Sequence, residues 1–193
     1  MKSSYEKPSL RTRIEDNIVH NKLGSYIYKN YIKTLDLRGN ENVLDFGSGS
    51  GAGSRHLAKF LEKNGGHLTC VDISQFWMDK AKKRMKKYNN VDYLVGQLPD
   101  LNLSSNYFDA IYIFYSLHHV SENLRNDIVK EFYRILNEDG KIYIKESQRE
   151  DDGISIDEIV GLMQSNKFAK VYSVNEDNAY RAVYKKRGSK KGQ

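Results

Sequence analysis

Apolar and polar residues along the chain change period several times. Five short apolar runs are typical of strands, and helical spacing of apolar residues separates them; the runs cover residues 43–44, 67–71, 91–95, 108–115 and 141–146. Two more runs, 169–174 and 180–184, flank the turn-forming stretch Asn175-Glu176-Asp177-Asn178, which predicts a hairpin. This order predicts an α/β fold: a Rossmann-like, doubly wound seven-stranded sheet, mostly parallel, with a C-terminal antiparallel hairpin and helices on both faces.

The helices between these runs have recognisable starts. Ser74 is predicted to cap a helix whose inner face carries Trp77, Ala81, Met85 and Tyr88. Another helix is predicted over residues 121–136. The sequence Ser155-Ile156-Asp157-Glu158 is a capping box that opens a helix ending near residue 166.

Glycine marks the predicted breaks. Residues 14–37 are expected to form one or two helices, with Gly24 separating two pieces. A turn is expected at Asn64-Gly65-Gly66, and another at Asp139-Gly140 before the fifth strand.

The first strand-like run leads into an acid and alternating glycines, Asp45-Phe46-Gly47-Ser48-Gly49-Ser50-Gly51-Ala52-Gly53, and then into a helix. Only glycine lets backbone approach a ligand so closely, and the helix start offers free N–H groups to an anion. The loop also satisfies the dinucleotide pattern G-x-G-x-x-G/A. A carboxylate just before the glycines favours a ligand with an ammonium group, however, and Asp72 is spaced to hold a ribose. S-adenosylmethionine has both groups, whereas a loop that only turns the chain would not need four glycines.

Composition narrows the class of protein. The 193 residues suit one ordinary domain, and no run is long enough to span a membrane or typical of a signal peptide. Cys70, the lone cysteine, excludes an internal disulfide and a multi-thiolate metal site, so we expect a cytoplasmic protein without a metal. The net charge of +6 favours anionic partners only weakly. The basic residues Lys80, Lys82, Lys83, Arg84, Lys86 and Lys87 could bind phosphates, but we interpret them as a solvated helix face.

Four motifs in order resemble the class I S-adenosylmethionine-dependent methyltransferases, of the small type called methyltransferase domain 11. These are the loop from Asp45 to Gly51, Asp72 at the end of the second strand, Phe108-Asp109, and Arg134-Ile135-Leu136 with Asp139-Gly140. The likeness covers residues 35–185. It implies a domain at 37–186, preceded by a helical lid segment at 1–36 and followed by a basic, disordered tail at 187–193.

The resemblance also implies a cofactor site. Its residues would be Asp45, Gly47, Ser48, Gly49, Gly51, Asp72, Ile73, Gln97, Leu98, Phe114 and Tyr115. The family commonly has an aspartate where this chain has Gln97, which departs from the pattern, although a glutamine carbonyl still accepts a hydrogen bond from the adenine amino group. Ile73 would cover the adenine face, and Phe114 and Tyr115 would border the methionine part.

Candidates for chemistry follow the fourth and fifth strands. His119 and Glu146 are predicted catalytic residues, and Tyr28, Tyr115 and His118 are predicted to contact the acceptor. In an extended loop the two histidine rings would point to opposite sides, so at most one would face the cleft. In the alternative that we prefer, His119 bonds within its loop and His118 is solvated. Three roles remain open for Glu146: a base, an anchor for an ammonium substrate, or a carboxylate paired with Lys145 or Arg149.

Three functions remain open. The first is methyl transfer to a small molecule, which the absence of accessory modules favours. The second is methylation of RNA or protein, with docking through basic surface; the sequence after the fourth strand, Phe114-Tyr115-Ser116-Leu117, lacks the Asn/Asp-Pro-Pro-Tyr/Phe motif of base-amino methyltransferases. The third is a non-catalytic subunit that binds S-adenosylmethionine. No membrane partner is expected, and the sequence predicts no particular oligomeric state.

Overall fold

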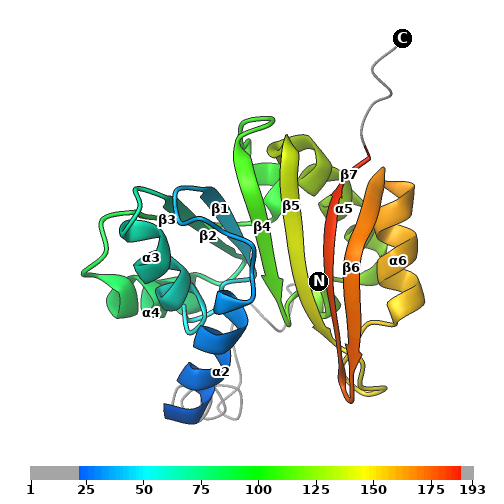
Figure 1. Ribbon diagram of the computed structural model, residues 1–193, viewed down its shortest axis with the longest axis horizontal. Helices are drawn as coiled ribbons and strands as arrows, with labels where there is room; N and C mark the ends of the chain where they lie inside the picture. Colours follow the sequence, from blue (N-terminus) through cyan, green and yellow to red (C-terminus); the bar gives the residue numbers. More distant parts are fainter. Residues whose placement is uncertain (1–21, 188–193) are drawn as a thin grey trace. The chain divides into compact units, whose positions relative to one another are not determined.

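A computed structural model describes residues 22–187, which divide between two compact units, Met1–Gln97 and Leu98–Gln193 (Figure 1). The first unit contains α2 (Lys22–Lys33), β1 (Asn42–Phe46), α3 (Ser54–Glu62), β2 (His67–Asp72), α4 (Gln75–Met85) and β3 (Val91–Val95). The second contains η1 (Leu98–Leu101), β4 (Phe108–Phe114), η2 (Leu117–His119), α5 (Glu122–Ile135), β5 (Leu136–Ser147), α6 (Ile156–Ser165), β6 (Phe168–Glu176) and β7 (Ala179–Lys186). The predicted lid segment and basic tail lie largely outside the described residues and stay predictions.

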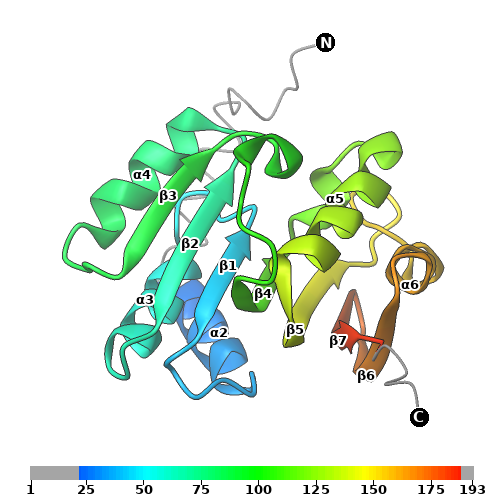
Figure 2. The same ribbon diagram turned by 90° about the horizontal axis from the view of Figure 1, so that it is seen from above.

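The first unit is a parallel sheet in the order β3-β2-β1, with helices packed against it (Figure 2). Val43 and Leu44 of β1 are completely buried, as expected of a parallel strand covered on both faces. Helix α3 packs against β2, α4 packs against β2 and β3, and α2 packs against α3. The parallel register brings the carboxyl ends of β1 and β2, with Asp45 and Asp72, to the same edge of the sheet.

Helix α4 begins where the sequence predicts but buries a slightly different face. The Ser74 hydroxyl accepts a hydrogen bond from the Trp77 N–H at 3.4 Å, which confirms the cap. The buried residues of the helix are Met78, Ala81 and Met85. Trp77 is only partly buried, and the Lys80 ammonium lies 4.8 Å from its ring centroid, so the prediction that Trp77 belongs to the inner face is wrong.

The second unit has strand order β4-β5-β7-β6. Strands β4 and β5 are parallel, and β7 runs antiparallel to both β5 and β6, which confirms the C-terminal hairpin. The core includes Tyr180 and Tyr184 of β7, whose buried hydroxyls hydrogen-bond to each other at 2.9 Å. Helix α5 packs against β5, and α6 packs against β6.

Two predicted breaks are wrong. Gly24 lies inside α2 and does not divide it. Asp139 and Gly140 belong to β5, which begins directly after α5. The register there shifts from Phe108 opposite Leu136 to Ala110 opposite Lys141, so the extra residues form an irregularity of the strand rather than a turn before it.

The start of α6 agrees with the predicted cap. The Ser155 hydroxyl accepts from the Glu158 N–H at 3.1 Å. The Glu158 carboxylate, which a full capping box would turn back to the Ser155 N–H, instead pairs with Arg125 at 2.6 Å. The cap therefore forms, while its acidic partner connects α6 to α5.

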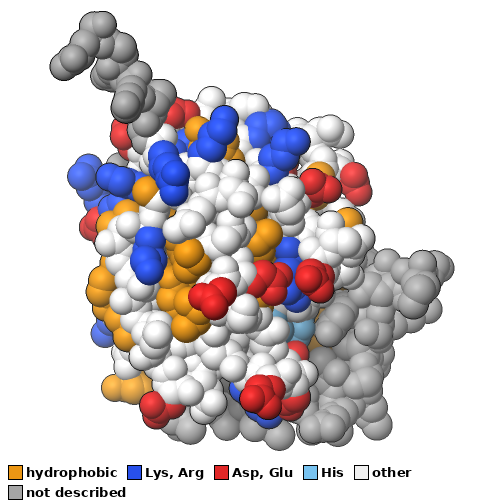
Figure 3. All heavy atoms as spheres, turned by 90° about the vertical axis from the view of Figure 1, so that its right-hand side faces the viewer, with side chains coloured by type: hydrophobic (Ala, Val, Ile, Leu, Met, Phe, Trp, Pro, Cys, Tyr) orange, Lys and Arg blue, Asp and Glu red, His pale blue; other side chains and the backbone are white. Residues whose placement is uncertain are grey.

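The face seen in Figure 3 carries hydrophobic side chains exposed beside Lys and Arg side chains. The exposed apolar residues of the edge strand β6 are Val171 and Tyr172. Within residues 22–187, none of the helices combines the length and the apolar character that crossing a bilayer requires.

Candidate functional site

Asp45, near the end of β1, is a buried carboxyl group to which, within the described part of the chain, one side chain donates a hydrogen bond. Only 3% of the residue is exposed, and the Ser54 hydroxyl donates to its Oδ2 at 2.5 Å. Burial raises the pKa of Asp45 to about 7, the Ser54 bond opposes the rise, and the nearby charge of Asp72 adds to it. In the described part of the chain no lysine or arginine pairs with this carboxylate, so a cationic ligand group would stabilise its ionised form.

The glycine loop is tied to the end of β2. The N–H groups of Gly47 and Ser48 both donate to the Val71 carbonyl, at 2.8 and 3.0 Å. Gly49 and Gly51 have φ values of 54° and 77°, a region that other residues rarely adopt. A Cβ on Gly49 would meet nothing within 4 Å, so the loop leaves open space at this position for a ligand.

Gly51 serves a different purpose. A Cβ built there would lie 3.0 Å from Met85 Cε and 3.2 Å from the backbone Cα of Ala81, so the glycine allows α4 to pack directly against the loop. Arg84 of α4 secures the same contact, because its guanidinium donates to both the carbonyl and the hydroxyl of Ser50. This arginine, counted with the solvated basic residues of the helix, is therefore a structural brace of the loop.

Alanine substitutions at Gly49 and Gly51 are expected to have different effects on stability and on ligand binding. Gly49→Ala is expected to lower the free energy of unfolding by about 1–2 kcal/mol, the cost of a left-handed backbone alone, while obstructing ligand binding. Gly51→Ala adds steric overlap with α4 and is expected to cost about 2–4 kcal/mol. Urea unfolding together with titration of S-adenosylhomocysteine measures both. Equal stability losses in the two variants would contradict the assignment.

Asp72 closes β2 and holds two loops by their backbones. Its Oδ2 accepts from the Gly49 N–H and its Oδ1 from the Ser74 N–H, both at 2.8 Å. Burial raises the pKa of Asp72, and these hydrogen bonds oppose the rise. A carboxylate has about four acceptor positions, so these backbone hydrogen bonds leave Asp72 capacity to accept from a ligand hydroxyl. The arrangement suits a diol presented at the edge of the sheet.

The other predicted contact residues near the end of β2 and on α2 differ in their exposure. Ile73 is half-buried, Gln97 is exposed, and Tyr28 is half-buried on α2. The Gly96 N–H bonds to the Asp72 carbonyl at 3.0 Å, which fixes the backbone just before Gln97. Leu98 opens η1 in the second unit and is buried. Their contacts with a cofactor stay predictions.

In the second unit, β4 ends in a strained residue. Tyr115 has φ 52°, and its N–H donates to the Lys145 carbonyl at 2.8 Å. Burial and the nearby Glu176 and Glu146 charges raise the pKa of its phenol, although 36% of the residue is exposed. Phe114 lies stacked on Tyr112 with ring centroids 5.9 Å apart, so its ring belongs to the aromatic packing of the strand.

The segment after β4 is helical, so the condition of an extended loop, under which the two rings would point to opposite sides, is not met. His118 and His119 lie on the short helix η2, where their ring centroids are 3.9 Å apart. The His118 side chain is 4% exposed and that of His119 is 40% exposed, the reverse of the preferred expectation. Burial, followed by the proximity of His118, lowers the pKa of His119, which favours the neutral ring.

Glu146 is completely buried and joins β5 to this segment. Its Oε1 accepts from the backbone N–H groups of Ser116 and Leu117, at 3.0 and 2.7 Å, and its Oε2 contacts His118 Nδ1 at 2.5 Å. The suggested ion pairs are absent among residues 22–187: Lys145 pairs with Glu176, and Arg149 pairs with Asp151. These contacts favour a positioning role for Glu146 over that of a base that meets the substrate.

Arg125 is a residue of this segment that sequence analysis does not single out. Its guanidinium donates to the carbonyls of His118 and Val120, at 3.0 and 2.9 Å, and to Glu158. It thereby holds the backbone of η2 against α5 and α6. Its position on α5 outside every motif gives no sequence signal for this role.

Comparison with known proteins agrees with both the loop and the fold. Residues 43–140 match the family model described as a methyltransferase domain, which covers half of the chain. The chain belongs to the methyltransferase domain family. It is 30% identical over 141 residues to the ubiquinone/menaquinone biosynthesis C-methyltransferase UbiE of Rickettsia prowazekii, covering 70% of this chain and 52% of that protein.

Two further likenesses support this assignment. The phosphoethanolamine N-methyltransferase of Plasmodium falciparum is 28% identical over 116 residues, covering 60% of this chain and 42% of that protein. A SAM-dependent methyltransferase structure from Aquifex aeolicus matches with a TM-score of 0.69 at 19% identity, over 81% of this chain and 88% of that one. The chain thus spans about half the length of these two curated relatives, and the solved structure confirms the Rossmann-like methyltransferase fold.

S-adenosylmethionine is the cofactor of class I methyltransferases, and the residues of the first unit fit it. The ligand has an ammonium group for Asp45, which is buried without a cationic partner in the described residues, and a ribose diol for Asp72. The open space beside Gly49 allows backbone to approach it. Asp45, Asp72 and the glycine loop are therefore the candidate site for this cofactor.

Proposed function

We propose that this chain transfers the methyl group of S-adenosylmethionine to a small-molecule acceptor. The observation that carries the proposal is the placement of two acids at one sheet edge. Asp45 is buried with no cationic partner among residues 22–187, and Asp72 can accept further hydrogen bonds. The cofactor supplies an activated sulfonium methyl, so the protein needs mainly to position the acceptor for in-line attack.

We assign the roles as the family resemblance implies. Asp45 holds the ammonium group, Asp72 holds the ribose, and Ile73, Gln97 and Leu98 contact the adenine. The loop from Gly47 to Gly51, including Ser48, passes beside the cofactor, with Phe114 and Tyr115 near its methionine part. Tyr28, Tyr115 and His118 contact the acceptor.

His119 is the residue that we assign to receive the acceptor's proton, because its ring is accessible and its lowered pKa favours the neutral form. Glu146 assists from behind by orienting His118. His119→Ala should lower turnover while leaving the affinity for S-adenosylmethionine unchanged, which separates proton transfer from cofactor binding.

A small acceptor is supported by the relatives' names, which refer to quinone biosynthesis and to phosphoethanolamine. The basic surface that would favour an RNA or protein substrate has one exposed residue fewer, because Arg84 braces the glycine loop. The remaining lysines of α4 suit a solvated face.

Cofactor binding is expected to depend on pH through Asp45. With a pKa of about 7, half of this carboxyl is ionised at pH 7. Only about one tenth is ionised at pH 6, so the affinity for S-adenosylhomocysteine should fall about fivefold between these values. Titration calorimetry should record proton release, because the ligand's ammonium selects the ionised form. The affinity of Asp45→Asn should be weaker and independent of pH in this range. If the affinity of the wild-type protein did not change with pH, the role of Asp45 would be contradicted.

The folding stability of the ligand-free protein should change with pH in the opposite direction to the cofactor affinity. A folded-state pKa raised above the ordinary value makes the folded chain bind more protons, so this carboxyl favours folding below about pH 4 and loses that contribution as the pH rises to about 7.

The proposal is tested with labelled S-adenosylmethionine, first on a reduced quinone ring and on phosphoethanolamine, then on cell extract. Label in the metabolite fraction that is absent with Asp72→Ala supports a small-molecule methyltransferase. Label in RNA, with affinity falling steeply as salt rises, would establish the second function instead. Tight cofactor binding without label in any fraction would overturn methyl transfer in favour of a non-catalytic subunit.

A further inference from the structure

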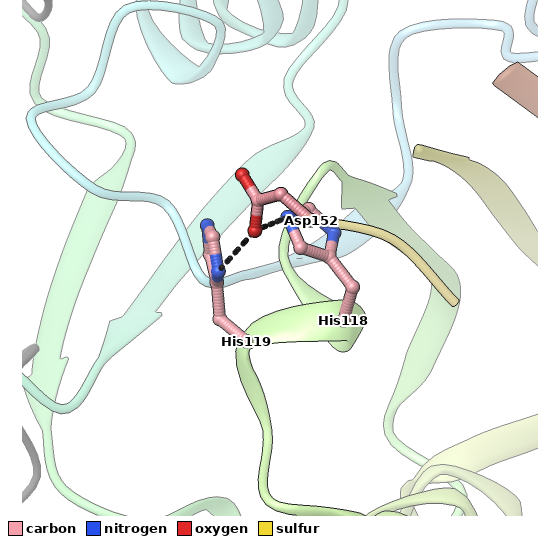
Figure 4. A group of neighbouring side chains, drawn as sticks. All are labelled: His118, His119 and Asp152. Atoms are coloured by element: carbon pink, nitrogen blue, oxygen red, sulfur yellow. Dashed lines mark ion pairs between the residues drawn. The ribbon is translucent and has the colours of Figure 1, made fainter. Parts of the chain in front are cut away.

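Three side chains that can bind a metal converge beyond the ends of β4 and β5 (Figure 4). His118 and His119 come from η2, and Asp152 comes from the loop after β5. Asp152 Oδ1 lies 3.8 Å from His118 Nε2 and 4.0 Å from His119 Nδ1. The three ligand atoms all lie within 4.8 Å of one another.

The proton on His118 can be assigned from its surroundings. Nδ1 faces Glu146 Oε2, and the other oxygen of that buried carboxylate already accepts two backbone N–H groups. A carboxylate only accepts, so Nδ1 carries the hydrogen and Nε2 presents its lone pair toward Asp152. A histidine that donates one ring N–H to a carboxylate and offers the other nitrogen is the usual arrangement of a metal-bound imidazole.

The spacing suits a shared cation better than direct contact. The separations of 3.8 and 4.0 Å exceed hydrogen-bonding distance. A tetrahedral ion with bonds of about 2.0–2.1 Å holds its ligand atoms about 3.4 Å apart. A small closing movement brings the three atoms to this spacing, and the 40% and 62% exposed side chains of His119 and Asp152 have room to make it.

The loop that carries Asp152 is held in place. The Ile154 N–H donates to the Ser147 carbonyl at 3.0 Å, and the Gln148 amide donates to the Ile154 carbonyl at 2.6 Å. Gly153 lies so close to the strand end that a Cβ would meet the Ser147 carbonyl oxygen at 2.7 Å. These contacts close the loop that carries Asp152 against the end of β5.

We propose that His118, His119 and Asp152 bind a divalent first-row transition cation of the Zn²⁺ class. The ligands would be Nε2 of His118, Nδ1 of His119 and a carboxylate oxygen of Asp152, with Glu146 orienting His118 from behind. Two imidazoles and one carboxylate suit Zn²⁺ rather than Mg²⁺, and three protein ligands leave a fourth position open. This site departs from the sequence expectation of no metal. It does not depend on the proposed methyl transfer, but a bound ion would occupy the acceptor nitrogen of His119, so His119 would receive the acceptor's proton only in the metal-free chain.

The test is binding of Zn²⁺ to the full, untagged chain by calorimetry, with Co²⁺ as a spectroscopic probe of the ligands. One equivalent should bind, and Co²⁺ should give the visible bands of a low-coordinate site. Asp152→Asn and His119→Gln should each weaken binding by at least about 10- to 100-fold. Both changes are made on partly exposed side chains, so circular dichroism should confirm an intact fold.

Matched controls distinguish this site from adventitious binding. Asp151→Asn alters the neighbouring acid, which pairs with Arg149, and His67→Gln alters a histidine that pairs with Asp92 elsewhere. Neither should change the affinity. Absence of stoichiometric binding, or equal losses with Asp151→Asn and Asp152→Asn, would overturn the proposal in favour of plain pairing between Asp152 and protonated histidines.

Discussion

Asp72→Ala is expected to weaken binding of S-adenosylmethionine by about 2–4 kcal/mol, or roughly 30- to 1,000-fold. The substitution removes charge-assisted hydrogen bonds to both ribose hydroxyls. It also releases the Gly49 and Ser74 N–H groups, so the glycine loop loses its connection to the end of β2. Calorimetric titration with the cofactor and with S-adenosylhomocysteine measures the loss.

Two further variants separate binding from folding. Asp92→Ala removes an exposed carboxylate on β3 that pairs with His67, and it should leave affinity unchanged. Asp72→Asn keeps one acceptor oxygen and should show an intermediate loss. Wild-type affinity in Asp72→Ala, with a normal urea midpoint, would remove the basis for the cofactor site.

Glu146→Ala is expected to lower the free energy of unfolding by about 3–5 kcal/mol. The carboxylate is completely buried, and its loss leaves two backbone N–H groups and the His118 ring without their acceptor. Such buried donors cost about 1–3 kcal/mol each. Urea unfolding followed by circular dichroism gives the change in free energy.

The control for this prediction is Asp151→Ala. Asp151 and its partner Arg149 are 71% and 62% exposed, so their ion pair should contribute less than about 1 kcal/mol. Glu146→Gln retains one acceptor and should fall between the two. A loss below 1 kcal/mol in Glu146→Ala would mean that the residue does not organise the segment after β4.

Local signals explain what the sequence could predict. The strands, the hairpin and the Ser74 and Ser155 caps depend on residues a few positions apart, and each is confirmed. The Asp45-to-Gly51 loop could be predicted for the same reason, because its residues follow one another in the sequence. Its two glycines of different function could not be told apart, since only packing against α4 distinguishes Gly51 from Gly49.

Long-range contacts explain what the sequence could not predict. The partners of Glu146 lie about 30 residues earlier, and Asp152 approaches the histidines only because β4 and β5 are parallel neighbours. Gly24 is a helix breaker by propensity, yet it lies within α2, which packs against α3 through later residues. The register shift near Gly140 arises from pairing with β4, so no property of Asp139 and Gly140 alone would reveal it.

The left-handed backbone of Tyr115 carries an energetic cost. A glycine would adopt φ 52° without the penalty of about 1–2 kcal/mol that a side chain incurs. The Tyr115 ring packs edge-to-face on Phe114 with ring centroids 4.7 Å apart, so the strain and this contact oppose each other, and a glycine at 115 would remove both.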